Sequence, residues 1–218
     1  MQFNWLNQQN NPSLILFFNG WGMDACAVSS LACDGFDLLE INDYSTPTPL
    51  PAFQEYDQTI LIAWSLGLIA AAQSGIKADL AIAVNGTLRP IDDRLGIPPA
   101  IFQGTIDNWH ERGRNKFNRR MCGDRETLAH FSRTPPARSI EAQQQELIAI
   151  RNNVKTQPEP TNIFDIAIIS SGDRIVPPAA QNAYWTEQQT AFITLDAPHY
   201  LFNRWHSWKE LIDCAQNR

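Results

Sequence analysis

The sequence predicts an α/β fold, in which a mostly parallel β-sheet is flanked by helices and a small helical lid is inserted late in the chain. Short apolar runs bounded by proline, glycine or asparagine alternate with helix-forming segments, which is the pattern of a parallel sheet. Between residues 89 and 160 these runs disappear, and charged and polar residues dominate. We therefore expect one core from residues 1–88 and 161–218, and a lid from residues 89–160 that precedes the expected strand Ile163–Ile169.

Six apolar runs are the expected strands. Ser13–Phe18 is the clearest, because a continuous apolar run that ends at Asn19-Gly20 fits a strand covered on both faces. The other runs are Phe36–Ile41, Thr59–Ile62, Leu80–Val84, Ile163–Ile169 and Ala191–Leu195. The expected helices are Phe53–Asp57, Leu68 to about Gly75, Pro178–Trp185 and a closing helix near the end of the chain.

The turn after the third expected strand carries the first candidate for chemistry. The segment Ala63-Trp64-Ser65-Leu66-Gly67 places a serine on a sharp strand-to-helix turn, with a small residue two positions to either side. Small residues there let the strand and the helix pass closely. This is the nucleophile elbow G-x-S-x-G of α/β hydrolases, with Ala63 in place of the first glycine. The alternative is an ordinary turn in which Ser65 only caps the helix.

A second loop of interest follows the strand Ser13–Phe18. In Asn19-Gly20-Trp21-Gly22-Met23, two glycines flank one residue, so the backbone can turn sharply and expose an N–H. An N–H at the end of this strand is what the second half of an oxyanion hole needs, and Trp21 is its expected donor. A plain glycine turn is the alternative.

An acid and a histidine follow the last two expected strands. Asp173 comes after Ile163–Ile169 and His199 after Ala191–Leu195, so both belong to the sheet edge where open α/β sheets place their chemistry. With Ser65 they stand in the order Ser, Asp, His, which is that of the α/β hydrolases. An imidazole with a pKa of about 6.5 accepts the serine proton during attack, and the acid holds its tautomer. We predict Ser65 as nucleophile, His199 as base and Asp173 as acid.

The rival candidates fit this arrangement less well. The other histidines do not follow an expected strand, because two fall in the lid and one on the closing helix: His110, His130 and His206. Asp165 lies inside an expected strand, and Asp196 is too close to His199 along the chain to approach it from across the site.

Composition argues against several other classes of protein. The longest early apolar run, Leu14–Phe18, is far shorter than the roughly 20 residues that span a bilayer, and no basic region precedes it as in a signal peptide. We therefore expect a cytoplasmic protein with no membrane partner. Metal-binding spacings and a phosphate-binding glycine loop are absent from the sequence, so we expect no metal and no cofactor. The net charge of −6 and the lack of a known nucleic-acid-binding motif argue against nucleic acid as a partner.

These motifs together resemble one known family. Asn19–Met23, Ala63–Gly67, Gly172–Pro177 and Ala197–His199 are similar to the corresponding segments of the BioG-type pimeloyl-[acyl-carrier protein] methyl ester esterases of bacterial biotin synthesis. The similarity extends over nearly the whole chain, and includes a compact start in which the strand before the Trp21 loop is the first strand. It implies that Trp21 and Leu66 donate backbone N–H groups to the oxyanion.

The resemblance also implies a reaction. A serine carboxylesterase of this family hydrolyses the methyl ester of a pimeloyl chain held on the phosphopantetheine of an acyl carrier protein, freeing methanol and the ω-carboxylate. Within enzymes, the alternatives are a broad short-chain carboxylesterase and a thioesterase that cuts the acyl–pantetheine link. A catalytically idle binding module with the same fold is the alternative from another class.

Charge distribution indicates where a carrier protein would dock. From Arg89 to Lys155 there are twelve basic and eight acidic residues, a net charge of +4 that leaves −10 on the rest of the chain. A basic lid on an acidic body suits an acidic partner such as a carrier protein. The expected contacts are five arginines of the lid: Arg112, Arg114, Arg119, Arg120 and Arg125. A solvated charged surface is the alternative for each of them.

Aromatic residues in the same segment have two interpretations. They line an acyl tunnel or they supply the internal packing of the lid, and the residues concerned are Phe102, Trp109, Phe117 and Phe131.

Overall fold

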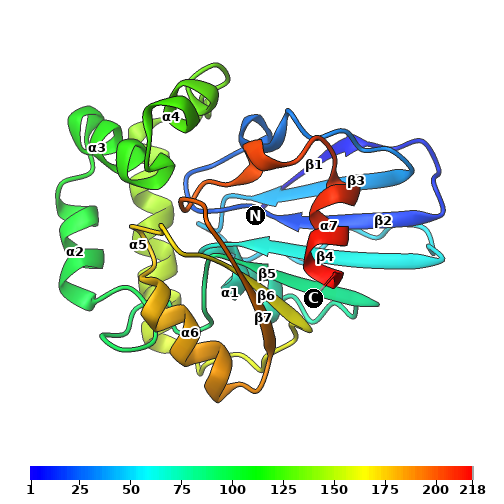
Figure 1. The fold of residues 1–218 in the computed structure, drawn as a ribbon. Coiled ribbons are helices and arrows are strands. Elements are labelled where there is room, and N and C mark those ends of the chain that lie inside the picture. The colour runs from blue at the N-terminus through cyan, green and yellow to red at the C-terminus, as the bar shows by residue number, and fades with distance from the viewer. Residues whose placement is uncertain (218) are drawn as a thin grey trace.

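The computed structural model describes residues 1–217, and within them the strands form one seven-stranded sheet (Figure 1). The strand order is β1-β3-β2-β4-β5-β6-β7. All neighbouring strands are parallel except β1 and β3, which are antiparallel. The bounds are β1 Gln2–Asn7, β2 Ser13–Phe18, β3 Phe36–Asn42, β4 Gln58–Trp64, β5 Leu80–Val84, β6 Ile166–Ser170 and β7 Ala191–Leu195. The mostly parallel sheet that the sequence predicted is confirmed.

Helices lie on both faces of the sheet and beyond the carboxyl ends of its strands. Their bounds are α1 Gly67–Gln73, α2 Pro99–Asp107, α3 Glu111–Cys122, α4 Arg125–Phe131, α5 Ile140–Thr156, α6 Pro178–Glu187 and α7 Trp208–Gln216. Figure 1 shows α7 lying across one face of the sheet, whereas α2 to α5 gather beyond the carboxyl ends of the strands. Among residues 1–217, no helix combines the length and apolar character needed to cross a membrane.

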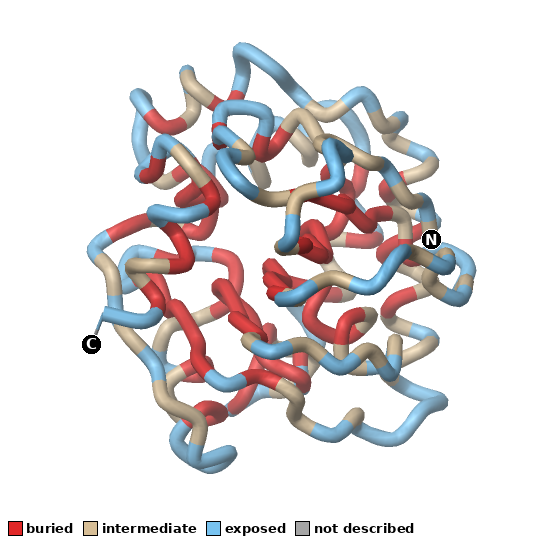
Figure 2. The backbone as a smooth tube through the Cα atoms, turned by 90° about the vertical axis from the view of Figure 1, so that its right-hand side faces the viewer, coloured by how far each residue is buried: buried red, intermediate tan, exposed pale blue. Residues whose placement is uncertain are grey.

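The core is centred on β2, in which Leu14 to Phe18 have no exposed surface. A strand buried on both faces explains the uninterrupted apolar run, because neither face meets water. The edge strand β7 instead alternates exposed and half-buried residues. Figure 2 shows the buried backbone concentrated in the interior and the exposed backbone on the outer loops.

Local signals explain where the inserted helices begin and end. At the start of α3, α4 and α5, a side chain of His110, Asp124 or Ser139 accepts a backbone N–H of the first turn. The end of α3 is set by Gly123, whose φ is +75°. A Cβ at Gly123 would lie 2.8 Å from Cβ of Pro198, so this helix end packs directly against the loop that carries His199.

Two expectations about the first part of the chain are wrong. Ser13–Phe18 is the second strand, because Gln2–Asn7 forms β1 on the edge of the sheet. Its alternating pattern of polar and apolar residues is short, and only pairing with β3 makes it a strand. No helix forms at Phe53–Asp57, which is irregular and ends with the backbone N–H of Asp57 donating to the carbonyl of Pro12 at 2.8 Å.

Smaller corrections concern the ends of elements. Helix α1 stops at Gln73, two residues before Gly75. Strand β6 begins at Ile166, so Asp165 precedes the strand, and its carboxylate accepts the backbone N–H of Ala81 at 2.8 Å. Helix α7 begins at Trp208, so His206 lies before this helix and not on it.

Candidate active site

Ser65 occupies a strained turn between β4 and α1. Its φ is +56°, a left-handed conformation that is costly for a residue with a side chain. The turn passes so close to the end of β2 that a Cβ at Gly67 would lie 2.4 Å from the carbonyl oxygen of Asn19. Ala63, the other small position, is fully buried in β4. The sequence requirement for small residues therefore has a direct steric cause.

The hydroxyl of Ser65 is not a helix cap. Within residues 1–217, α1 has no side-chain cap, and its N-cap residue is Leu66. The Ser65 Oγ instead lies 3.0 Å from Nε2 of His199. The other ring nitrogen of His199, Nδ1, lies 2.7 Å from Oδ2 of Asp173. The structure thus brings the three predicted residues into one chain of hydrogen bonds, and all three side chains are buried.

Asp173 is held by its own loop and by α6. Its Oδ1 accepts the backbone N–H groups of Ile175 and Val176 at 2.8 and 2.9 Å. Its Oδ2 accepts Nε2 of Gln181 at 3.0 Å, in addition to the contact with His199. These donors fix the carboxylate so that one oxygen faces the imidazole, which sets the tautomer with a proton on Nδ1.

The backbone of His199 is also anchored. Its carbonyl oxygen accepts Nδ2 of Asn85 at 2.9 Å and Nε1 of Trp64 at 3.2 Å. Asn85 has a φ of +48° and also bonds Ser170, so it joins the ends of β5 and β6 to the histidine loop. Sequence reasoning did not predict that Asn85 and Gln181 hold His199 and Asp173 in place. An Asn-Gly pair after a strand was a signal for a turn only, and Gln181 has no local signal.

Trp21 and Leu66 lie beside Ser65 on the wall of one cavity. No backbone carbonyl among residues 1–217 accepts the N–H of either residue. Gly20 is packed against Trp64, because a Cβ there would lie 2.8 Å from the indole ring. The two N–H groups predicted to bind an oxyanion are therefore available next to the serine.

The cavity is apolar and small, with a volume of about 30 Å³. Its wall combines Ser65 and His199 with side chains of α2, α3 and α5, among them Phe102, Phe117 and Leu147. Of the four aromatic candidates, Phe102 and Phe117 line it. Trp109 packs on Trp21 with ring centroids 4.3 Å apart, and Phe131 packs on Tyr200 at 5.1 Å. Phe102 and Phe117 thus line the cavity, whereas Trp109 and Phe131 pack against aromatic residues outside the segment 89–160.

The rival residues lie apart from this chain of hydrogen bonds. His110 caps α3, His130 lies beside Tyr200 with the two rings tilted, and His206 donates its backbone N–H to the carboxylate of Glu210. Asp196 is exposed, and its carbonyl oxygen accepts a bond from Arg204.

The five predicted docking arginines do not form a single cluster. Arg112, Arg119 and Arg120 share one face of α3, since they are seven and eight positions apart, whereas Arg114 lies on another face and Arg125 begins α4. None of the five has an ion-pair partner within the described residues. Arg120 lines the cavity, and its Nη2 donates to the carbonyl oxygen of Arg174 at 2.8 Å.

Comparisons with known proteins identify relatives over nearly the full length. The family model described as pimeloyl-ACP methyl esterase BioG matches residues 1–211. The crystal structure of BioG from Haemophilus influenzae has a TM-score of 0.90 and 35% sequence identity, covering 97% of this chain and 99% of that one. A malonyl-[acyl-carrier protein] O-methyltransferase from Bacteroides fragilis is 37% identical over 191 residues. That match covers 85% of this chain, which spans only 39% of the relative's length.

A more distant neighbour bears on the fold alone. The crystal structure of a lipase-esterase related protein from Clostridium acetobutylicum has a TM-score of 0.66 at 13% identity, covering 97% of this chain and 98% of that one. Together with the sheet order, this similarity confirms the α/β-hydrolase fold that the sequence predicted.

Proposed function

Because the chain belongs to the family of pimeloyl-ACP methyl esterase BioG, we propose that it is a serine esterase acting on the methyl ester of pimeloyl-[acyl-carrier protein]. Hydrolysis releases methanol and frees the ω-carboxylate, as a step of biotin synthesis. The observation that carries this proposal is the hydrogen-bonded chain from Ser65 through His199 to Asp173 on the wall of an apolar cavity.

The first half of the proposed reaction forms an acyl-enzyme. Ser65 Oγ attacks the ester carbonyl carbon while its proton passes to Nε2 of His199, and Asp173 stabilises the imidazolium. The carbonyl oxygen becomes an oxyanion, which accepts the backbone N–H groups of Trp21 and Leu66. When the tetrahedral intermediate collapses, the methoxy group leaves with the proton from His199 as methanol.

The second half returns the enzyme to its starting state. A water molecule gives a proton to His199 and attacks the acyl-enzyme carbonyl, again through an oxyanion held by the same two N–H groups. Collapse breaks the bond to Ser65 Oγ, which takes the proton back. The product is the free carboxylate at the end of the chain, which remains attached to the carrier.

We propose that residues 89–160 act as a lid, as the sequence predicted. A cavity of about 30 Å³ is far below the roughly 150 Å³ of a protein cavity that binds benzene, so a pimeloyl chain needs the side chains of α2 and α3 to move outward. The face of α3 that carries Arg112, Arg119 and Arg120 lies beside the cavity, since Arg120 is also part of the cavity wall. An acidic carrier protein docked there would present its acyl chain to Ser65.

Mass spectrometry of a carrier protein loaded with pimeloyl monomethyl ester tests the proposal. The expected product is a carrier that keeps its acyl chain. Its mass should fall by that of one CH2 group, because the ester methyl is replaced by hydrogen and leaves as methanol. Loss of the whole acyl chain would identify a thioesterase instead. An unchanged carrier, with the enzyme folded, would overturn the proposed function. The Ser65→Ala variant supplies the blank for this assay.

A further inference from the structure

The Trp21 and Gly22 end of the Trp21 loop is held by helix α5. Three hydrogen bonds join them. Nε1 of Trp21 donates to the carbonyl oxygen of Gln143 at 2.6 Å, Nε2 of Gln143 donates to the carbonyl oxygen of Gly22 at 2.8 Å, and the backbone N–H of Gly22 donates to Oε2 of Glu146 at 3.0 Å. Both backbone groups of Gly22 are thereby fixed, and Gly22 directly follows the Trp21 N–H that faces the oxyanion in the proposed reaction.

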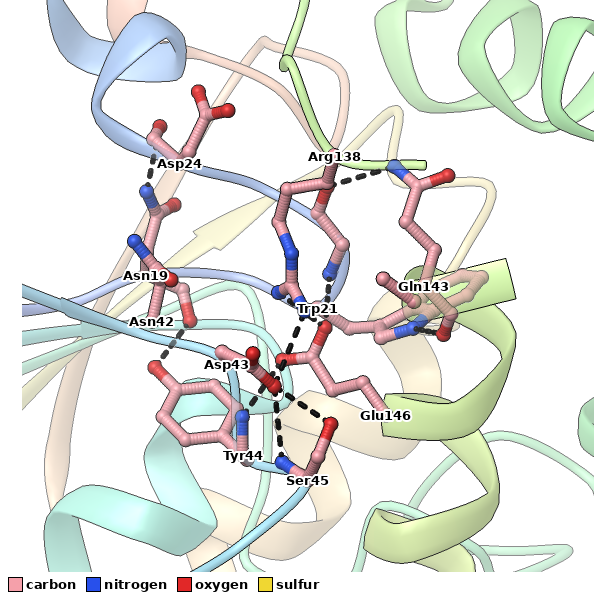
Figure 3. Close-up of polar contacts among 12 residues, drawn as sticks. Asn19, Trp21, Asp24, Asn42, Asp43, Tyr44, Ser45, Arg138, Gln143 and Glu146 are labelled. Carbon is pink, nitrogen blue, oxygen red and sulfur yellow. Dashed lines mark hydrogen bonds and ion pairs between the residues drawn. The ribbon is translucent and has the colours of Figure 1, made fainter. Parts of the chain in front are cut away.

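Glu146 is a fully buried carboxylate with a partner on each side. Besides Gly22, it accepts Nη1 of Arg138 at 2.7 Å and the backbone N–H of Tyr44 at 3.0 Å. Arg138 also forms an ion pair with Asp43 at 3.1 Å. Figure 3 shows Arg138 and Glu146 facing each other beside Trp21, with Asp43 and Tyr44 on the side of the sheet.

The opposite end of the loop is tied to the same set of residues. The hydroxyl of Tyr44 donates to the carbonyl oxygen of Asn19 at 2.7 Å, and the side-chain oxygen of Asn19 accepts the backbone N–H of Gly20 at 2.9 Å. The loop is therefore fixed at both Gly20 and Gly22, while the N–H of Trp21 between them donates to no backbone carbonyl within residues 1–217.

A buried charge of this kind has an electrostatic cost. Burial raises the pKa of Glu146 to about 7, against the opposing effect of Arg138 and of the two backbone N–H groups. An apolar residue of the same size would fill the space without that cost. An acceptor for the Gly22 N–H is what the carboxylate adds.

We propose that Glu146 is a positioning residue, which with Gln143 holds the Trp21 loop so that the Trp21 N–H points at the reacting carbonyl oxygen. This inference rests on the proposed ester hydrolysis. Glu146 itself contacts neither the cavity nor Ser65. Its effect is on the oxyanion, a species that exists only after attack, so it acts on the transition state and leaves substrate binding alone.

The test compares Glu146→Gln with Glu141→Gln, an exposed control on the same helix. Both are assayed on a small chromogenic ester, with kcat expressed per serine that a fluorophosphonate labels. This normalisation removes any change in the folded fraction, which a merely structural role would alter. We expect kcat of Glu146→Gln to fall by about 10- to 100-fold with KM within about twofold, because losing one oxyanion donor entirely costs about 10²–10³. Glu141→Gln should match the wild type.

A second variant covers the case in which Glu146→Gln does not fold. Gln143→Met keeps the size of the side chain and the backbone carbonyl that Trp21 uses, but it removes the bond to the Gly22 carbonyl. It should lower kcat in the same direction by a smaller factor. If kcat per labelled serine stays unchanged in every variant that folds, the positioning role is wrong. If the folded wild type cleaves neither this ester nor the carrier-bound ester, the proposed function fails instead, and the two failures are thus distinct.

Discussion

The two halves of the candidate active site are held in different ways. Ser65, Asp173 and His199 stand on turns that follow β4, β6 and β7, so the sheet itself sets their spacing. The Trp21 loop also follows a strand, β2, but it bonds to α5 in the inserted segment. No side chain of the inserted segment hydrogen-bonds to the Ser65–His199–Asp173 chain within residues 1–217, whereas the Trp21 loop bonds directly to a helix inserted between β5 and β6. The two halves should therefore fail separately.

Breaking the proton-transfer half should have the largest effect. Ser65→Ala and His199→Ala are each expected to lower kcat by several orders of magnitude, because triad residues act as a unit. Circular dichroism should show both variants folded. A rate above about a tenth of the wild-type value in either variant would remove that residue from the triad.

Changing the acid should give the next largest loss. Asp173→Asn preserves the shape of the side chain but favours the wrong tautomer of His199, so a drop in kcat of about 10³- to 10⁴-fold is expected. Asp196→Asn is the matched control, since Asp196 is exposed and its side chain has no place in the hydrogen-bonded chain. Greater sensitivity of Asp196 or Asp165 than of Asp173 would reassign the acid.

Glu146, which bonds the Trp21 loop, should make the free energy of unfolding depend on pH. The pKa of Glu146 is raised by burial from 4.5 to about 7. With a raised pKa, the folded state binds this proton more tightly than the unfolded state does. The resulting stabilisation of the fold is complete below about pH 4.5 and is lost as the pH rises through 7. Relative to Glu146→Gln, the wild type should therefore lose on the order of 3 kcal/mol of unfolding free energy across this range.

Urea unfolding of both proteins at several pH values measures that difference. The pKa of Glu40 is also raised by burial, but Glu40 is present in both proteins and its effect cancels. A difference that does not change with pH would mean that burial does not raise the pKa of Glu146.

Docking should show the smallest effect and should leave both halves intact. Arg112→Glu with Arg119→Glu reverses two exposed charges on α3, and Arg120 is left alone because it lines the cavity. At low ionic strength we expect kcat/KM on the carrier-bound ester to fall about tenfold, with a small chromogenic ester unaffected, because surface charges act mainly on encounter. The loss should shrink as salt is added.

Lys77→Glu is the control for total charge, since Lys77 is exposed between α1 and β5. Equal losses on both substrates would indicate damage to α3. An unchanged rate on both would leave these arginines as a solvated surface, and the carrier would then have to dock elsewhere.

Sequence reasoning succeeded where the chemistry is local. The turns at Ser65 and Trp21 are recognisable because small residues are required within two positions, and the structure shows the steric reason at Gly67. Strand ends placed Asp173 and His199 at the correct edge of the sheet. Membership of the family, inferred from these motifs, is confirmed by the match over residues 1–211.

What escaped prediction depends on distant contacts. Trp21 and Gln143 are 122 positions apart, and Gly22 and Glu146 are 124 apart, so no local pattern links them. Glu146 on a helix of mostly polar composition reads as an ordinary surface residue, although it is fully buried. The first strand was missed for a related reason, since Gln2–Asn7 is ordered by pairing with β3.

Fluorophosphonate labelling tests most directly the central claim that Ser65 is an activated nucleophile. Intact-protein mass spectrometry followed by peptide mapping should find one adduct, on Ser65, in the wild type. No adduct should form on Ser65→Ala, and labelling of His199→Ala should be slowed by orders of magnitude because no base removes the hydroxyl proton. A folded wild-type protein that forms no adduct, or an adduct that persists in Ser65→Ala, would contradict the account.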